Sequence, residues 1–348
     1  MTSIPSNAGV LAESWSDANL RETPRAGFAW SMLVLPGVVL AAAAVAGFAP
    51  LGCSIVTVFL FAGPHNWFEA RYMLSRMPAK WGPLRPYFLL GIGGTILLTG
   101  IFAAMPYAAT ALDWGYADYL TAIAGWNTLL VSWIVGMALL RSRQNPRRDW
   151  AWLVPVGGIV IAMNWLRPLA WSQALVYLHP LMALWFLDRE LAHQPRAWRT
   201  AYRAALSLLP LCMLGLWWLL GSTPDLPGDD PLSAAIARHA GAEIISGVST
   251  RFLVAAHVFL ELLHYAAWII AIPLASHRSL PWQISAVPLA KRSPAWRRSI
   301  LGVVLLGLAI MLILWGAFLA DYPATRDVYF TVAMLHVLAE VPFLLRLL

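Results

Sequence analysis

Charged residues and cysteines are both scarce in this chain. Asp, Glu, Lys and Arg make up 12% of its 348 residues, whereas hydrophobic residues make up 60%. A soluble globular domain has about 25% charged residues and about 45–50% apolar residues. The two cysteines, Cys53 and Cys212, are too few for a disulfide framework or a cysteine-based metal motif. The composition therefore excludes an ordinary soluble domain and indicates a polytopic membrane protein.

Several motifs of well-known chemistry are also missing. The chain has no Walker A sequence, no H-E-x-x-H, no G-x-G-x-x-G that opens a helix after a strand, and no H-x-x-H-H box of membrane fatty-acyl desaturases. These absences argue against ATP-driven transport by this chain alone, zincin proteolysis and Rossmann-type redox chemistry. The first 27 residues lack the apolar core and small-residue cleavage site of a secretory signal peptide, so we expect no removable signal.

Long apolar runs are what the sequence has in abundance. Runs of about 20 apolar residues match the thickness of a bilayer, and they predict an all-α fold, a polytopic transmembrane helix bundle. We expect about ten spans, at 28–49, 51–70, 86–107, 118–140, 150–166, 169–187, 203–221, 250–274, 299–320 and 328–346. Residues 1–27 would form a cytoplasmic tail before a single transmembrane domain at 28–348. Within that domain, 222–249 would form an outside loop with a short amphipathic helix.

Basic residues gather in every second loop between these spans. The loops after the second, fourth, sixth and eighth spans contain Arg71, Arg76, Lys80, Arg85, Arg141, Arg143, Arg147, Arg148, Arg189, Arg196, Arg199, Arg203, Arg278, Lys291, Arg292, Arg297 and Arg298. The opposite loops are nearly free of Lys and Arg. The positive-inside rule then places both termini in the cytoplasm, and we expect the inner membrane of a bacterium. Because topology accounts for the net charge of +7, we expect no nucleic-acid partner.

Histidine and glutamate recur together in three of the spans. The second span has His65 and Glu69, the eighth has His257, Glu261 and His264, and the tenth has His336 and Glu340. Positions i, i+4 and i+7 lie on one face of a helix, so each span presents a polar stripe. All three spans run inward in the expected topology. The seven side chains therefore reach similar depth, and we expect them to meet in one layer if the three helices pack together.

These side chains form a plausible ligand set for a metal. A charged carboxylate in the hydrocarbon costs at least about 2.5 kcal/mol, so such acids are normally paired. Mixed nitrogen and oxygen ligands suit iron, manganese or zinc, and the step from Glu261 to His264 is the Glu-x-x-His step of bundle di-iron sites. We expect one or two iron ions as the cofactor, with zinc or haem as alternatives. His65, His257, His264 and His336 are the expected histidine ligands, and the three glutamates ligate the metal or orient imidazoles.

Other polar residues are secondary candidates. His179, on the sixth span at comparable depth, is a possible further ligand, although a histidine before a proline also serves in local hydrogen bonding. Tyr265, beside His264, is a candidate proton relay or hydrogen-bond donor and, with Glu261, a candidate catalytic residue. Asn127 and Asn164 are expected to pack helices together. The remaining histidines, which the sequence places in loops, receive no role: His193, His239 and His277.

The pattern leads to one principal hypothesis and several alternatives. We expect an integral-membrane non-haem iron oxygenase or desaturase that acts on a carotenoid or other isoprenoid, a quinone or an acyl chain entering from the bilayer. An electron-donor protein is a possible partner, besides membrane lipids. A zinc hydrolase is a variant of this hypothesis. A proton- or ion-coupled transporter that uses the same stripe, a haem-binding subunit and a purely structural His–Glu network remain open.

Overall fold

The computed structural model describes residues 24–145, 149–275, 284 and 287–347, and the described part is helical with no strand. In chain order the helices are α2 (Pro24–Phe48), α3 (Pro50–Arg76), η1 (Gly82–Leu84), α4 (Arg85–Ala111), α5 (Tyr116–Gln144), α6 (Leu153–Leu166), α7 (Pro168–Leu191), α8 (Arg196–Leu206), α9 (Leu208–Leu220), α10 (Pro231–His239), α11 (Thr250–Ala266), η2 (Ala267–Ala271), α12 (Ile272–Ala275), η5 (Pro288–Lys291), α13 (Pro294–Ala320) and α14 (Tyr322–Leu347). The all-α fold class is confirmed for these residues. The expected N-terminal tail up to residue 23 lies outside them, as do Arg147, Arg148, His277 and Arg278.

Seven of the helical stretches are long and apolar enough to cross a membrane. They are Pro50–Arg76, Gly82–Ala111, Tyr116–Gln144, Arg196–Leu220, Thr250–Ala275, Pro294–Ala320 and Tyr322–Leu347. The pair of α6 and α7 adds at most one more, and the apolar helix Val34–Phe48 is shorter than a span. Every segment expected to span is mostly helical where the structure describes it, but a count of ten crossings is not confirmed.

The break between α6 and α7 has a local chemical cause. The two helices meet at Arg167 with a bend of 119°. Arg167 precedes Pro168 and has φ −145° and ψ 75°, outside the helical region. The proline ring disfavours the helical conformation of the residue before it, so α6 ends after 14 residues. Two crossings were expected here, whereas the structure has one short and one long helix at a steep angle.

A buried amide cluster holds this break against α5. The side-chain nitrogen of Asn127 donates to Oδ1 of Asn164 at 2.8 Å, and Asn164 donates in turn to the carbonyl oxygen of Ala124 at 2.9 Å. Asn127 also lies 3.2 Å from the hydroxyl of Ser172 in the first turn of α7. Both asparagines are buried. The expected packing role of Asn127 and Asn164 is therefore confirmed.

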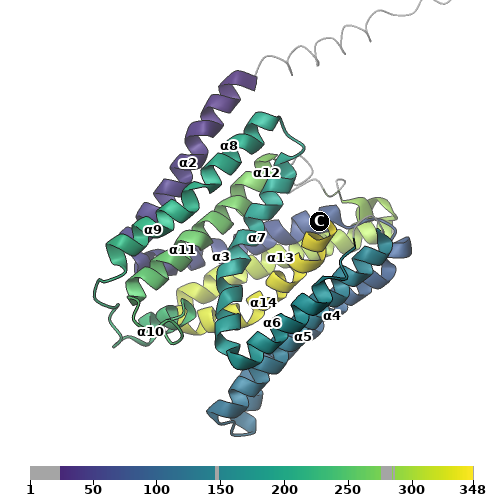
Figure 1. Ribbon diagram of the computed structural model, residues 1–348. Helices are drawn as coiled ribbons and strands as arrows, with labels where there is room; N and C mark the ends of the chain where they lie inside the picture. The colour runs from purple at the N-terminus through teal and green to yellow at the C-terminus, as the bar shows by residue number, and fades with distance from the viewer. Residues whose placement is uncertain (1–23, 146–148, 276–283, 285–286, 348) are drawn as a thin grey trace, which may run out of the picture.

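Helix α11 forms the centre of the bundle. It packs against α2, α3, α7 and α9, which surround it in Figure 1. Residues 253–260 are all buried, so other helices cover this part of α11 on every side, including the face of His257. Directly after α11 the helix widens into the π-helical turn η2. Such turns are rare and frequently lie at functional sites.

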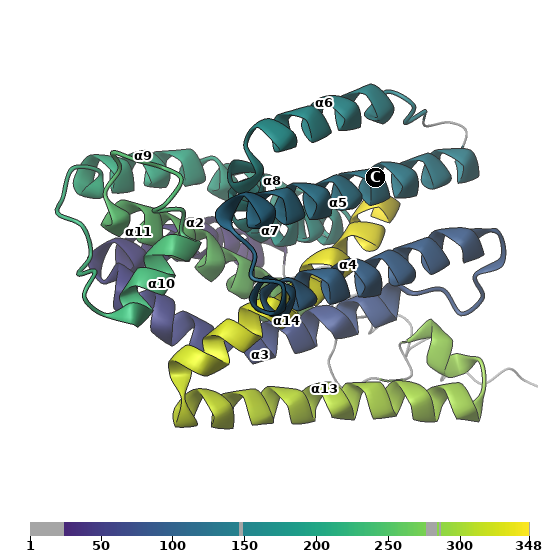
Figure 2. The same cartoon turned by 90° about the horizontal axis from the view of Figure 1, so that it is seen from below.

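The periphery of the bundle is apolar. Helix α13 lies along one edge, next to α3 and α14, as Figure 2 shows. Its outer side chains are exposed, among them Ile310 at 56% and Ile313 at 69%. On α9, Leu214 is 63% exposed in the same way. Large apolar side chains in such numbers on one surface mark contact with an apolar medium, which agrees with a protein embedded in lipid.

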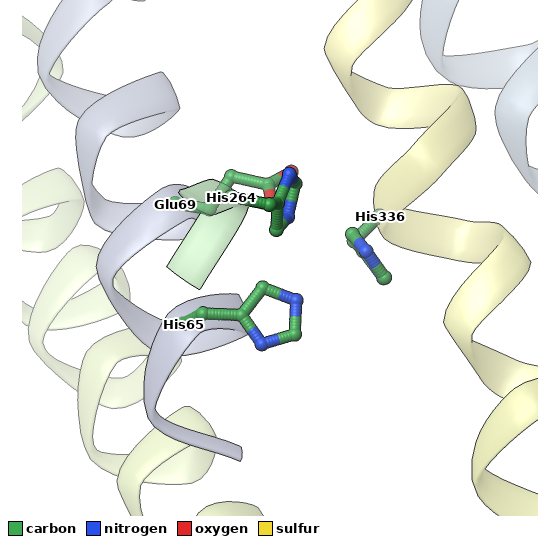
Figure 3. Close-up of side chains that lie close together, drawn as sticks. All are labelled: His65, Glu69, His264 and His336. Atoms are coloured by element: carbon green, nitrogen blue, oxygen red, sulfur yellow. The ribbon is translucent and has the colours of Figure 1, made fainter. Parts of the chain in front are cut away.

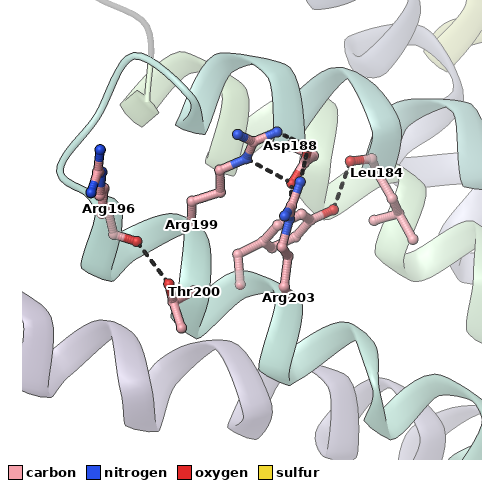
Figure 4. Close-up of polar contacts among 7 residues, drawn as sticks. Leu184, Asp188, Arg196, Arg199, Thr200 and Arg203 are labelled. Atoms are coloured by element: carbon pink, nitrogen blue, oxygen red, sulfur yellow. Dashed lines mark hydrogen bonds and ion pairs between the residues drawn. The ribbon is translucent and has the colours of Figure 1, made fainter.

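Charged side chains link α8 to the end of α7, as Figure 4 shows. The carboxylate of Asp188 accepts hydrogen bonds from Arg199 at 2.6 Å and from Arg203 at 2.8 Å. Arg199 forms a second bond to the other carboxylate oxygen at 3.1 Å, so its guanidinium is bidentate. Arg196, Arg199 and Arg203, which belong to the basic loop expected after the sixth span, thus all lie on α8. Two of them, Arg199 and Arg203, bind the same acid, Asp188.

Candidate metal centre

Four of the predicted ligands come together inside the bundle. His65 and Glu69 of α3, His264 of α11 and His336 of α14 each offer one ligand atom, and these atoms all lie within 4.8 Å of one another. Figure 3 shows the side chains of α3 and α14 reaching from opposite sides into one space. His65, Glu69 and His264 are at most 2% exposed. The three helices that carry the His–Glu pattern therefore pack together, as the predicted site requires.

The backbone of α3 orients the first of these imidazoles. Nδ1 of His65 lies 2.8 Å from the carbonyl oxygen of Phe61, one turn earlier in the same helix. As donor in this bond, Nδ1 carries the proton and leaves the lone pair on Nε2. This arrangement fixes both the ring and the tautomer, in the way that histidine ligands of metals are usually held. His65 is thus prepared to ligate through Nε2.

His179 of α7 extends the cluster. Its Nε2 lies 3.2 Å from Nε2 of His336, and its ring lies 4.6 Å from the ring of His264. Its other nitrogen, Nδ1, lies 3.2 Å from Oε2 of Glu340, a residue with no exposed surface. A carboxylate behind an imidazole whose far nitrogen faces a metal is a common outer-shell arrangement. The geometry makes His179 a fifth candidate ligand and Glu340 its orienting acid.

Many polar atoms at this place are buried without a hydrogen-bond partner. They are Oε2 of Glu69, Nδ1 of His179, both nitrogens of His264, Nδ1 of His336 and both carboxylate oxygens of Glu340. Each unsatisfied buried polar group costs about 1–3 kcal/mol, and native structures keep few of them. Their concentration in one place indicates a shared partner. A divalent cation fits, because it accepts nitrogen and oxygen donors and balances the charge of two carboxylates.

The other half of the α11 stripe lies apart from this group. Nδ1 of His257 is 3.5 Å from Oε2 of Glu261, and neither residue belongs to the group of four that converge. His257 is seven residues before His264, which places it about 10 Å along the helix axis. The seven side chains were expected to meet in one layer, but they do not. The stripe on α11 is too long for all of its residues to reach one metal ion, so His264 joins the metal group and His257 and Glu261 do not.

Sequence reasoning passed over His239, which the structure places beside His257. The two rings lie 5.0 Å apart, and the helix that ends at His239 packs on α11 through buried Ile236 and Ala237. Burial, then the nearby His257 and Arg326, lowers the pKa of His239 well below its usual value. The signal available in the sequence was the amphipathic helix of the outside loop. Only packing could reveal which face of the bundle that helix covers.

A cavity of about 620 Å³ connects both polar groups. Its wall includes His65, His264 and His336 at one place and His239, His257 and Glu261 at another, and the rest is mostly apolar. The volume lies in the range of about 300–1,000 Å³ that is usual for small-molecule sites. Tyr265 also faces the cavity, and its ring lies 4.5 Å from that of His65.

No protein-family model, no curated protein and no solved structure matches this chain.

Proposed function

We propose that this protein is an integral-membrane non-haem metal enzyme that uses iron to oxidise a lipophilic substrate. The observation that supports it best is the position of the ligand group. One ligand atom each of His65, Glu69, His264 and His336 lies within 4.8 Å of the others, and the three histidines line a largely apolar cavity. Carotenoids and other isoprenoids, quinones and acyl chains all fit this description of a substrate. A zinc centre that hydrolyses a lipid ester is the nearest variant.

Each residue of the site has a role in this proposal. His65, Glu69, His264 and His336 hold the metal, and His179 is the fifth ligand. Glu340 orients His179 electrostatically, because its Oε2 lies 3.2 Å from Nδ1 of that ring. Iron, when bound, supplies the activation of dioxygen. The surrounding apolar side chains keep bulk water from the reacting atoms.

The proposal includes a membrane topology. All ten apolar segments lie within the bilayer, α6 and α7 as a bent hairpin, with both termini in the cytoplasm of a bacterium. The basic loops support this orientation. Substrate then enters sideways from the lipid, and an electron-donor protein has access to the basic cytoplasmic face.

A proton-coupled transporter is the second candidate. It is favoured by the second polar group, because His239, His257 and Glu261 extend the titratable side chains from the metal centre toward α10. Intramembrane chains of histidine and glutamate are what proton relays are made of. A transporter would keep its activity in protein that is free of metal, whereas an enzyme of the proposed kind would not.

Elemental analysis of protein purified in detergent tests the proposal. We expect about one or two iron ions per chain, no Soret band, and loss of most of the iron in His264→Ala. The matched control is His193→Ala, because His193 is an exposed histidine at the end of α7. Circular dichroism and gel filtration of both variants check that they fold. Unchanged metal content in folded His264→Ala would refute the proposed metal centre. Proton transport by metal-free protein in liposomes would favour the transporter.

A further inference from the structure

The second polar group lies in the same cavity as the metal centre but has a different character. His239, His257 and Glu261 form a short chain, with the imidazole rings 5.0 Å apart and His257 3.5 Å from the carboxylate. Oε2 of Glu261 is buried and has no hydrogen-bond partner. These three ligand atoms do not converge as those of the metal group do. All three residues line the cavity, so this group offers it hydrogen-bonding atoms without forming a converging ligand set.

Aromatic side chains surround this polar group. The ring of Phe330 lies 4.3 Å from His239 and 5.3 Å from Tyr329, and the ring of Tyr177 lies 5.7 Å from His257. Tyr329 and Phe330 both line the cavity. Flat aromatic walls favour a planar, conjugated ring as their occupant.

The distance to the metal centre is short. Glu261 and His264 are three residues apart on α11, so their side chains are neighbours on one face, about one helical turn apart. A molecule held by Glu261 therefore lies next to a metal ligand. A metal bound by His264 would thus lie close to such a molecule, and the side chains here offer two kinds of proton acceptor, a carboxylate and imidazoles.

We propose that the substrate is a hydroquinone with an apolar tail, and that Glu261 and His257 bind its hydroxyl groups. This inference rests on the proposed function, because it names the molecule that the metal centre oxidises. The ring lies among the aromatic side chains and the tail follows the apolar wall. A hydrocarbon polyene would leave the Glu261 carboxylate without a partner.

The reaction balances without a further reductant. Each hydroquinone breaks two O–H bonds, becomes a quinone, and gives up two electrons and two protons. The protons pass first to Glu261 and His257, and a metal held by the neighbouring ligand group would take up the electrons. Two hydroquinones together reduce one dioxygen to two waters, which consumes all four electrons and four protons. Dioxygen is the oxidant, and the quinone leaves through the lipid.

Decylubiquinol and its 1,4-dimethyl ether test the inference, because the ether has the same ring and tail without a donor hydroxyl. We expect iron-loaded protein to oxidise decylubiquinol with one dioxygen consumed for every two quinols. The ether should not react and should compete weakly. Glu261→Gln should lower kcat/KM by about 10-fold or more while the iron content stays the same. Glu243→Gln is the matched control, because Glu243 is exposed and pairs with Arg238 outside the cavity.

The possible failures are distinct from one another. Iron-loaded protein that leaves decylubiquinol unoxidised, or Glu261→Gln that turns over like the wild type, overturns the hydroquinone and leaves the metal enzyme standing. Protein that binds no iron overturns the proposed function. In that case anaerobic binding of decylubiquinol is measured by quenching of tryptophan fluorescence, since Trp126 and Trp171 line the cavity. Binding that Glu261→Gln weakens supports the second polar group as a hydroquinone site, and equal binding of quinol and ether overturns it.

Discussion

Nε2 of His179 and Nε2 of His336 lie 3.2 Å apart, although 157 positions separate the two residues in the sequence. Two nitrogens that each lie about 2.0–2.1 Å from one cation at ordinary ligand angles are about 3.0–3.4 Å apart. The pair therefore has a spacing that suits both a hydrogen bond between the rings and two ligands of the same ion. This relationship joins α7 to the three helices that carry the His–Glu pattern.

The first prediction concerns Glu340, which faces the other nitrogen of His179. Glu340→Gln should weaken metal binding by about 10–100-fold without abolishing it, because the carboxylate orients a ligand from the outer shell. Competition with a chelator of known affinity measures the change, and Glu243→Gln serves as control. Complete loss of metal would instead make Glu340 a direct ligand, and an unchanged affinity would remove it from the site.

The second prediction concerns the amide cluster at the break between α6 and α7. Asn127→Ala should lower the free energy of unfolding by about 1–3 kcal/mol, because the carbonyl oxygen of Asn164 loses its buried donor. Thermal unfolding in detergent, followed by circular dichroism, measures this. Thr110→Ala is the comparison, since Thr110 bonds only within its own helix. Equal melting temperatures for the two variants would contradict the role of the cluster.

The third prediction concerns the link between α7 and α8. Asp188→Ala should destabilise the protein more than Arg199→Ala, because it leaves two guanidinium groups without their acid. Arg203→Ala should have the smallest effect, since the side chain of Arg203 is 58% exposed and that of Arg199 27%. Melting temperatures of the three variants give the order. A larger loss in Arg203→Ala than in Arg199→Ala would contradict it.

The fourth prediction concerns pH. Burial lowers the pKa of His239 well below its usual value, so the unfolded chain takes up a proton at higher pH than the folded protein does. The contribution of His239 to stability is therefore complete above the ordinary histidine pKa of about 6.5 and is lost as the pH falls below it. The melting temperature should drop between pH 7.5 and pH 5, and less so in His239→Gln. Equal pH dependence in His239→Gln and the wild type would refute this assignment.

Local signals in the sequence account for the part of the fold that was predicted. Apolar runs predicted the helices. The bend at Arg167 follows from Pro168, although the apolar run at 150–166 was expected to form a full span. The number of crossings depends on helix lengths and angles in the assembled bundle. The lengths and angles of the helices are set by packing between segments that are distant in the sequence, and the hydropathy of a single segment does not reveal that packing.

The sequence by itself determined which side chains are costly to bury: the i and i+4 spacing put His65 with Glu69 and His336 with Glu340 on single helix faces. Tertiary structure alone decided which of them meet. It brought His179 to His336 and Glu340, left His257 and Glu261 with His239, and so made two polar groups from one stripe. The physical reason is that spacing along one helix fixes direction within that helix, whereas convergence depends on how several helices cross.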